Sequence, residues 1–328
     1  MLQDIIFSQS IIALISGVTQ STISRYIANN RIEHIKGTER RKKYSFENVR
    51  NIMQSLYSNE MISKKQVQVF FNFKGGTGKT SLCYQTSILF SLLGFNVLVL
   101  DCDPQGHLSY SFGFNEEEDR MTLYDVIVNK VDIEDTIKPV YQGLDIVPAN
   151  ISLTRLELPI NQMPNREKVL SKLLISMKKK YDFIFIDTNP TISTVNRNAT
   201  LVADVLNVVC ETQYYSLKGL EILMNEMNDF SEAMEKEINY VVIPNKYESK
   251  TATSQEVLGA LRKRYGSYVM ESIIRKCEDI NISAKKKMPV IGFCNKRSIA
   301  LEDILDLTKE MLKKSTINKQ GGILDANK

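Results

Sequence analysis

The chain has 328 residues, 43% of them hydrophobic and 24% charged, with a net charge of +4. These values are typical of a globular protein with a sizeable core, and they exclude a disordered or fibrous chain. No stretch reaches about 18 apolar residues, the first ten residues lack the basic start of a secretory signal, and the five scattered cysteines form no Cys-x-x-Cys pair. We therefore expect a cytoplasmic protein without a membrane span, disulfide framework or zinc ribbon.

The charges are unevenly distributed along the chain. Residues 1–66 carry 10 basic and 5 acidic side chains, residues 67–245 carry 15 and 23, and residues 246–297 carry 12 and 5. Two basic segments thus flank an acidic middle, and basic segments favour polyanionic partners such as nucleic acid. An ordinary solvated surface can have the same charge, so charge alone does not decide between the two.

The first segment with a recognisable pattern is residues 11–27, where two short amphipathic runs flank a turn containing Gly17. The small Ala13 would let two helices approach closely, Gly17 would support the turn, and Val18 and Ile23 would fill the space between the helices. This arrangement is typical of a helix-turn-helix and resembles the winged or MerR-like modules of bacterial regulators.

The second helix of this motif, capped by Thr19, would present short polar and basic side chains suited to base edges and phosphates. We predict DNA contacts from Gln20, Ser21, Ser24 and Arg25. The alternative is a small helical unit that packs on the main domain or mediates dimer contacts, and the residues leave it open.

A basic hairpin is expected next, because residues 31–36 and 40–44 alternate around a turn containing Gly37. Its second strand would form a wing along the phosphate backbone, with contacts from Arg40, Arg41 and Lys42. Ser45 is expected to cap a last helix, and residues 58–65 read as a linker.

From Gln66 onward, apolar strands alternate with helices, which predicts an α/β fold with a doubly wound, mostly parallel sheet. The expected strands are residues 67–73, 96–100, 144–148, 183–186, 205–210, 240–243 and 272–274. The expected helices are residues 79–93, 166–180, 216–235, 254–265 and 298–313. We therefore expect a helix-turn-helix domain, residues 1–65, and an α/β domain, residues 66–328.

A glycine-rich loop follows the first of these strands and opens a helix. Its glycines let amides surround phosphate oxygens, and the helix N-terminus adds a partial positive charge. Lys79 can reach β- and γ-phosphates, and the Thr80 hydroxyl can bind Mg²⁺. Phe73 stands where the usual P-loop has its first glycine, and the loop instead matches the deviant pattern K-G-G-x-G-K-[ST]. The predicted phosphate site comprises Lys74, Gly75, Gly76, Thr77, Gly78, Lys79, Thr80 and Ser81.

Two further motifs place carboxylates at strand ends. Asp101 and Asp103 follow one apolar run, and Asp187 ends another in the Walker B pattern, where an acid can hold Mg²⁺ through water. A single strand-end aspartate often only caps a loop. Beside the glycine-rich loop, however, the three acids predict one site, with Thr80, Asp101 and Asp187 as metal ligands.

Residues 67–312 resemble the ParA/MinD group of deviant Walker ATPases, and the two motifs at residues 74–80 and 101–106 look most like the ParA partition branch. The resemblance implies ATP and Mg²⁺ as cofactors and a homodimer that sandwiches the nucleotides. It implies catalytic roles for Lys74, Lys79 and Asp103. Lys74 would reach the partner subunit's phosphates, Asp103 would position or activate the attacking water, and Asn245 would lie near the adenine.

The resemblance also implies non-specific DNA binding by basic residues of the C-terminal half, here Lys250, Arg262, Arg264, Arg275 and Lys276. The favoured function is a nucleoid-associated DNA-partition ATPase whose hydrolysis a ParB-like centromere-binding protein stimulates. The N-terminal module would bind specific DNA for autoregulation.

Other functions were weighed against partition. A MinD-like membrane-cycling ATPase needs a C-terminal amphipathic helix, whereas residues 317–328 are mainly polar, so we expect no membrane partner. A reductase resembling the nitrogenase iron protein needs a pair of cysteines in a Gly-flanked loop, which the sequence lacks. A transcriptional repressor switched by ATP stays open, because repression and partition can coexist.

Overall fold

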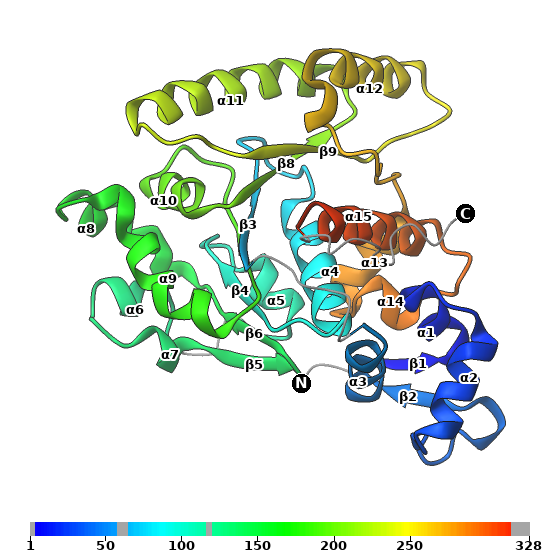
Figure 1. Ribbon diagram of the computed structural model, residues 1–328. Helices are drawn as coiled ribbons and strands as arrows, with labels where there is room; N and C mark the ends of the chain where they lie inside the picture. Colours follow the sequence, from blue (N-terminus) through cyan, green and yellow to red (C-terminus); the bar gives the residue numbers. More distant parts are fainter. Residues whose placement is uncertain (1–3, 58–64, 116–119, 316–328) are drawn as a thin grey trace.

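A seven-stranded sheet lies at the centre of the computed structural model, which describes residues 4–57, 65–115 and 120–315 (Figure 1). The strand order is β5-β6-β4-β7-β3-β8-β9. All neighbouring pairs are parallel except β5 and β6. The strands are β3 (Gln66–Phe71), β4 (Val97–Asp101), β5 (Lys138–Tyr141), β6 (Leu144–Val147), β7 (Phe183–Asp187), β8 (Val205–Glu211) and β9 (Tyr240–Asn245). The predicted doubly wound, mostly parallel sheet is confirmed.

Helices cover both faces of the sheet, which explains why its central strands are apolar on both sides. One core packs around α4 (Lys79–Leu92), α5 (His107–Ser111), α14 (Val290–Phe293) and α15 (Ile299–Ser315), with α13 (Glu278–Lys286) at its margin. The other packs around α6 (Leu123–Ile127), α7 (Ile133–Thr136), α8 (Glu157–Asn161), α9 (Val169–Lys180), α10 (Thr194–Val202), α11 (Tyr214–Ala233) and α12 (Ala252–Tyr265). The five long helices predicted from periodicity are all present, with small shifts at their ends.

Two details of the sheet differ from the sequence prediction. Residues 272–274 form no strand, because this segment hydrogen bonds to the β9 side at only a few separated places, near Val242, Pro244 and Tyr247. The edge strand β5 was not predicted. It contains Pro139 and is only four residues long, so it lacks the apolar run that marks the central strands.

The N-terminal residues form two helices separated by a tight turn, as predicted. They are α1 (Gln9–Ser16) and α2 (Gln20–Asn29). Gly17 adopts φ 72°, a left-handed conformation that favours glycine. The Thr19 hydroxyl accepts a hydrogen bond from the Thr22 amide and caps α2, and Ile23 is fully buried between the helices.

The predicted basic hairpin is wrong. Residues 31–36 form no strand, and β2 (Lys43–Ser45) pairs antiparallel with β1 (Ile6–Ser8) instead. This pairing places Phe7 opposite Tyr44, and both rings are buried, which the more polar segment 31–36, with no Phe, Tyr or Trp, could not achieve. The basic residues of the expected wing lie in a loop with one 3-10 turn, Glu39–Arg41.

The last N-terminal helix, α3 (Phe46–Tyr57), joins this module to the α/β part of the chain. Its first turn is capped by Ser45, whose hydroxyl accepts from the Asn48 amide. Phe46 stacks on Tyr141 of β5, and Arg50 donates to the carbonyls at the end of α4. Figure 1 shows the three N-terminal helices gathered beside α14 and the C-terminal end of α4. The domain boundary at residue 65 stays a prediction, because residues 58–64 lie outside the described residues.

Candidate functional site

The glycine-rich loop presents free hydrogen-bond donors at the N-terminus of α4. Within the described residues, the amides of Gly75, Gly76, Thr77 and Gly78 donate to no acceptor. Gly78 adopts φ 97°, and a Cβ there would lie 2.3 Å from the Asn245 side-chain nitrogen. Four free amides at the positive end of a helix dipole form a site for an anion.

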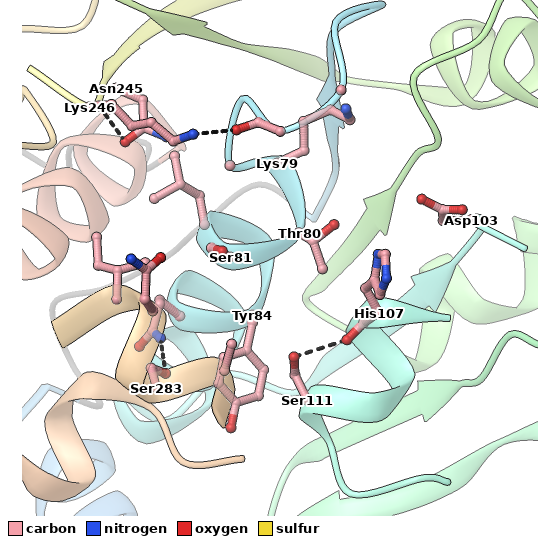
Figure 2. Close-up of a pocket in the computed structure, with 18 of the residues that line it drawn as sticks. Lys79, Thr80, Ser81, Tyr84, Asp103, His107, Ser111, Asn245, Lys246 and Ser283 are labelled. Atoms are coloured by element: carbon pink, nitrogen blue, oxygen red, sulfur yellow. Dashed lines mark hydrogen bonds between the residues drawn. The ribbon is translucent and has the colours of Figure 1, made fainter. Parts of the chain in front are cut away.

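A cavity of about 860 Å³ opens at this loop. Figure 2 shows Asn245 and Lys246 on one side of the loop and Asp103 and His107 on the other. Tyr84 lies farther along α4, and Ser283 lies on the neighbouring helix α13, where it accepts from Gln85. Another part of the wall is made by residues from the segment 275–285, which includes most of α13.

Two buried carboxylates lie side by side behind the loop, because Asp101 and Asp187 are paired across β4 and β7. The Thr80 hydroxyl donates to Asp187 Oδ2 over 2.6 Å, whereas Asp187 Oδ1 is buried with no partner in the described residues. Burial, followed by the charge of Asp101, raises the pKa of Asp187 well above its usual range. Burial likewise raises the pKa of Asp101 to about 6.

The two carboxylates differ in what they bind. Both oxygens of Asp101 accept hydrogen bonds, one from the Asp103 amide and the other from the amide and hydroxyl of Ser109. Asp101 therefore fixes the loop that carries Asp103. Asp103 itself is 8% exposed and lines the cavity.

Lys79 reaches into this acidic environment from the first turn of α4. Its side chain is buried, and its Nζ lies 3.4 Å from the Lys74 carbonyl oxygen. Burial lowers the pKa of its ammonium group, against the opposing effects of Asp187 and Asp103. A partly desolvated cation at the end of the glycine loop is suited to hold phosphate oxygens.

Lys74, the additional lysine of the deviant loop, makes a contact that the sequence did not predict. Lys74 Nζ donates to Glu211 Oε2 over 2.5 Å, and Lys246 Nζ donates to the other oxygen of the same carboxylate over 2.6 Å. Glu211 ends β8, so the rule that ligands bind at the carboxyl ends of parallel strands could have identified it. Lys246 directly follows the last residue of β9, so its position at the carboxyl end of a strand could have identified it in the same way.

The comparisons with known proteins agree with this geometry. The protein family described as an AAA domain matches residues 65–240, more than half of the chain. The cell division protein PomZ of Myxococcus xanthus (strain DK1622) is 32% identical over 225 residues, which cover 68% of this chain and 70% of PomZ. This chain belongs to the ParA/MinD family of ATPases.

Another protein resembles this chain in sequence, and a solved structure resembles it in fold. The chromosome partitioning protein ParA of Caulobacter vibrioides (strain NA1000 / CB15N) is 28% identical over 231 residues, covering 69% of this chain and 86% of that protein. The solved structure of a variant of Cyanothece McdA in complex with ATP superposes with a TM-score of 0.69 at 18% identity. It covers 77% of this chain and 98% of that chain, and it shows the fold.

The structure brings residues 75–81 and the acids Asp103 and Asp187 into this one site, whereas the Lys74 side chain lies outside the cavity on Glu211. Asn245 lies against the loop, with its side-chain nitrogen donating to the Thr77 carbonyl over 2.6 Å. This hydrogen bond does not test whether Asn245 lies near the adenine, so that role stays a prediction. The predicted metal role of Asp101 likewise stays a prediction.

The residues predicted to bind DNA lie outside the phosphate loop. On α2, Gln20, Ser21 and Arg25 are exposed, while Ser24 donates to the Gln9 side chain. In the C-terminal half, three predicted contacts are paired with acids: Arg264 with Glu221, Lys276 with Glu248, and Arg275 with Asp303 and Glu302. Arg275 and Lys276 also line the cavity, and Lys250 and Arg262 are exposed. DNA contact by any of them stays a prediction.

The described helices give no indication of a membrane span, since none is both long enough and apolar enough to cross a bilayer. The polar segment 317–328, on which the comparison with MinD-like proteins depended, lies outside the described residues.

Proposed function

We propose that this protein binds ATP with Mg²⁺ in the cavity at the glycine loop and hydrolyses it to ADP and phosphate. The observation that carries the proposal is the set of four free amides at residues 75–78, with Lys79 beside them. These donors suit a chain of phosphates, and the cavity extends from them along α4 to the wall formed by α13.

The residues beside the loop suit Mg²⁺. Thr80 offers a hydroxyl oxygen, and Asp187 offers a buried carboxylate with one free oxygen. No group of three or more His, Cys, Asp or Glu side chains in the described ranges is arranged to hold a metal ion. Mg²⁺ needs no such group, because it keeps several waters and takes one or two protein ligands together with phosphates. When bound, the ion would offset the negative charge of the phosphates and of the buried acids.

Each side chain then has a separate task. Lys79 would hold the terminal phosphate oxygens, and Asp103, which faces the cavity from the loop after β4, would orient the attacking water and accept its proton. Lys74 is partly exposed outside the cavity and could reach the phosphates of a second copy of the chain. Nucleotide binding would therefore favour a homodimer.

We further infer that this ATPase positions or segregates DNA. The inference rests on family membership and on relatives whose names refer to cell division and chromosome partitioning. Exposed Lys250 and Arg262 would contribute to non-specific DNA binding by the dimer, so the protein would associate with the nucleoid in the cytoplasm. A ParB-like centromere-binding protein would stimulate hydrolysis.

The N-terminal module, proposed to be a separate domain of residues 1–65, would bind specific DNA through the exposed face of α2. Basic residues 40–42 lie exposed in the loop before β2 and would contact phosphates. One observation favours the second candidate, a repressor switched by ATP: α3 contacts the end of α4, the helix that starts at the phosphate loop. Partition and ATP-controlled repression would then occur in one molecule.

Two measurements on the full-length chain test the proposal. Isothermal titration with a non-hydrolysable ATP analogue and Mg²⁺ should show binding to the wild type and none to Lys79→Ala, with Lys178→Ala, a half-exposed lysine of α9 away from the cavity, as the control. Equal affinity in Lys79→Ala would refute the proposed site.

A second measurement, of binding to random and upstream DNA with ATP, ADP or no nucleotide, then separates the two candidate functions. ATP-dependent binding to random DNA supports partition, whereas ATP-independent binding to one sequence alone contradicts it.

A further inference from the structure

Glu211 lies at the end of β8 between two lysines from different elements. Its side chain is only 6% exposed, and its two oxygens accept separately from Lys74 of the glycine loop and Lys246 after β9. Hydrogen bonds from the two lysines outweigh burial and hold the pKa of Glu211 below its usual value, so it is charged at neutral pH. One carboxylate thus joins the phosphate loop to the ends of two strands.

The two lysines are held unequally. Lys246 Nζ has a second strong acceptor, the Gly76 carbonyl oxygen at 2.6 Å, which fixes it against the loop. The second contact of Lys74 Nζ, to the Ser216 hydroxyl, is long at 3.4 Å. Lys74 is therefore the more easily displaced of the two. If it leaves, Lys246 still balances Glu211, so the carboxylate does not become a buried unpaired charge.

We propose that Glu211 is a positioning residue that holds Lys74 on its own subunit until the phosphates bound by a second copy compete for it. The proposal rests on the proposed function, in which Lys74 acts across a dimer. In the isolated subunit the Lys74 ammonium lies on the β8 side of the loop, directed at Glu211. Exchange of one anionic partner for another requires only a rotation of the lysine side chain, because the loop backbone stays attached through Lys246.

A first experiment measures the pairing itself and needs no nucleotide. The full-length chain is treated briefly with an acetylating reagent, and the modification of each lysine is quantified by peptide mass spectrometry. In Glu211→Gln, Lys74 loses its ionic partner, so its labelling relative to Lys250 should rise about twofold to fivefold, the range that corresponds to a partly exposed ion pair. Unchanged labelling of Lys74 would overturn the proposal.

A control separates this effect from a general change in charge. Glu134→Gln removes the same charge from another lysine pair, in which Glu134 of α7 lies 4.0 Å from Lys180 of α9. Labelling of Lys74 should not change in this variant. A rise as large as that in Glu211→Gln would show that the effect is not specific to the Glu211 contact and would contradict the proposal.

A second experiment measures the consequence for association. Sedimentation velocity at increasing ATP concentrations gives the concentration at which half of the chain is dimeric. Because Lys74 is no longer held, this concentration should fall about twofold to fivefold in Glu211→Gln and stay unchanged in Glu134→Gln. A rise in Glu211→Gln would instead indicate that the pairing supports the active geometry, and it would refute the proposal.

The outcomes distinguish this proposal from the proposed function. A wild-type chain that does not bind or associate with ATP refutes the proposed function, and the dimer role of Glu211 with it, whatever the labelling shows. A wild type that associates normally while Glu211→Gln shows no shift refutes the proposal alone. If Glu211→Gln is misfolded by circular dichroism, Glu211→Asp replaces it. The aspartate side chain is one methylene shorter, so its carboxylate cannot reach both lysines. The same rise in Lys74 labelling is therefore expected in Glu211→Asp, and unchanged labelling would contradict the proposal.

Discussion

Arg50 offers a direct test of how firmly the N-terminal module is attached to the ATPase. Its side chain is buried, and its guanidinium donates to the carbonyls of Ser91 and Phe95 and to the Asn96 side chain. These acceptors lie at or just after the C-terminal end of α4, where a cation also offsets the negative end of the helix dipole. Arg50 therefore satisfies groups of the ATPase from a helix of the N-terminal module.

The cost of Arg50→Ala can be worked out from these contacts. Each buried acceptor left without a donor costs about 1–3 kcal/mol, and the Asn96 amide, which is exposed, recovers a bond to water. Two buried carbonyls thus give about 2–6 kcal/mol. For a chain of this size the urea dependence is about 3 kcal/mol per M, so the unfolding midpoint should fall by about 0.7–2 M. Gln54→Ala removes one exposed hydrogen bond, to the Gly94 carbonyl, and should cost under about 1 kcal/mol.

Urea unfolding followed by circular dichroism, with limited proteolysis of the native protein, measures the effect. We expect Arg50→Ala to unfold at a lower urea concentration and to be cleaved faster within residues 4–57 than Gln54→Ala. Arg50→Lys keeps the charge but not the forked donors, so it should lie between the two. Equal midpoints and equal cleavage for Arg50→Ala and Gln54→Ala would refute the reasoning that this contact attaches the module.

Three further predictions concern the site and the proposed DNA surface. Asp103→Ala should still bind an ATP analogue while its turnover falls at least tenfold, as measured by phosphate release, and normal turnover would remove its role. The pKa of Asp101, raised to about 6 by burial, means that the folded state binds its proton more tightly than the unfolded chain. Stability should therefore fall as pH rises from about 4 to 6 and should fall less in Asp101→Asn, whereas equal slopes in urea unfolding would contradict this. Arg262→Ala should reduce the slope of log affinity against log salt for random DNA by about 0.9, and Arg264→Ala, whose charge is already paired with Glu221, by less; equal reductions would show that the ion pair does not matter.

The sheet was predictable because its central strands are apolar runs, two of which end at Asp101 and Asp187. The apolar stretch Phe183–Asp187 predicts a buried strand from its own residues, without knowledge of the strands that flank it. Its place beside the glycine loop follows from the fold class. The site followed for the same reason, since Asp187 ends a strand, Asp103 lies in the loop after one, and Lys79 and Thr80 open the helix that follows the glycine loop. The acid Asp101 also ended a strand, but its full set of hydrogen bonds depends on the position of Ser109, which no local pattern gives.

Features that depend on tertiary partners could not be read in this way. The return strand was predicted at residues 40–44, whereas the strand spans residues 43–45 and pairs with residues 6–8, where Phe7 and Tyr44 are both buried. The segment 272–274 has the composition of a strand but makes only scattered bonds to β9. Likewise, charge counts could not show that Arg275 is paired with Asp303, almost 30 positions along the chain.

Helix α4 connects the phosphate site with the N-terminal module through direct contacts along its length. It begins at Lys79, its middle residue Gln85 bonds to Ser283 and to the Val290 amide, and the Ser91 carbonyl in its last turn accepts from Arg50. In the proposed function, a bound phosphate chain would contact the first turn of the same helix whose last turn contacts Arg50 of the module. If ATP changes the affinity of the module for its specific DNA, linkage requires that this DNA changes the affinity for ATP by the same factor. Operator DNA and random DNA should then differ in their effect on nucleotide affinity, which is the property that separates ATP-controlled repression from partition within one molecule.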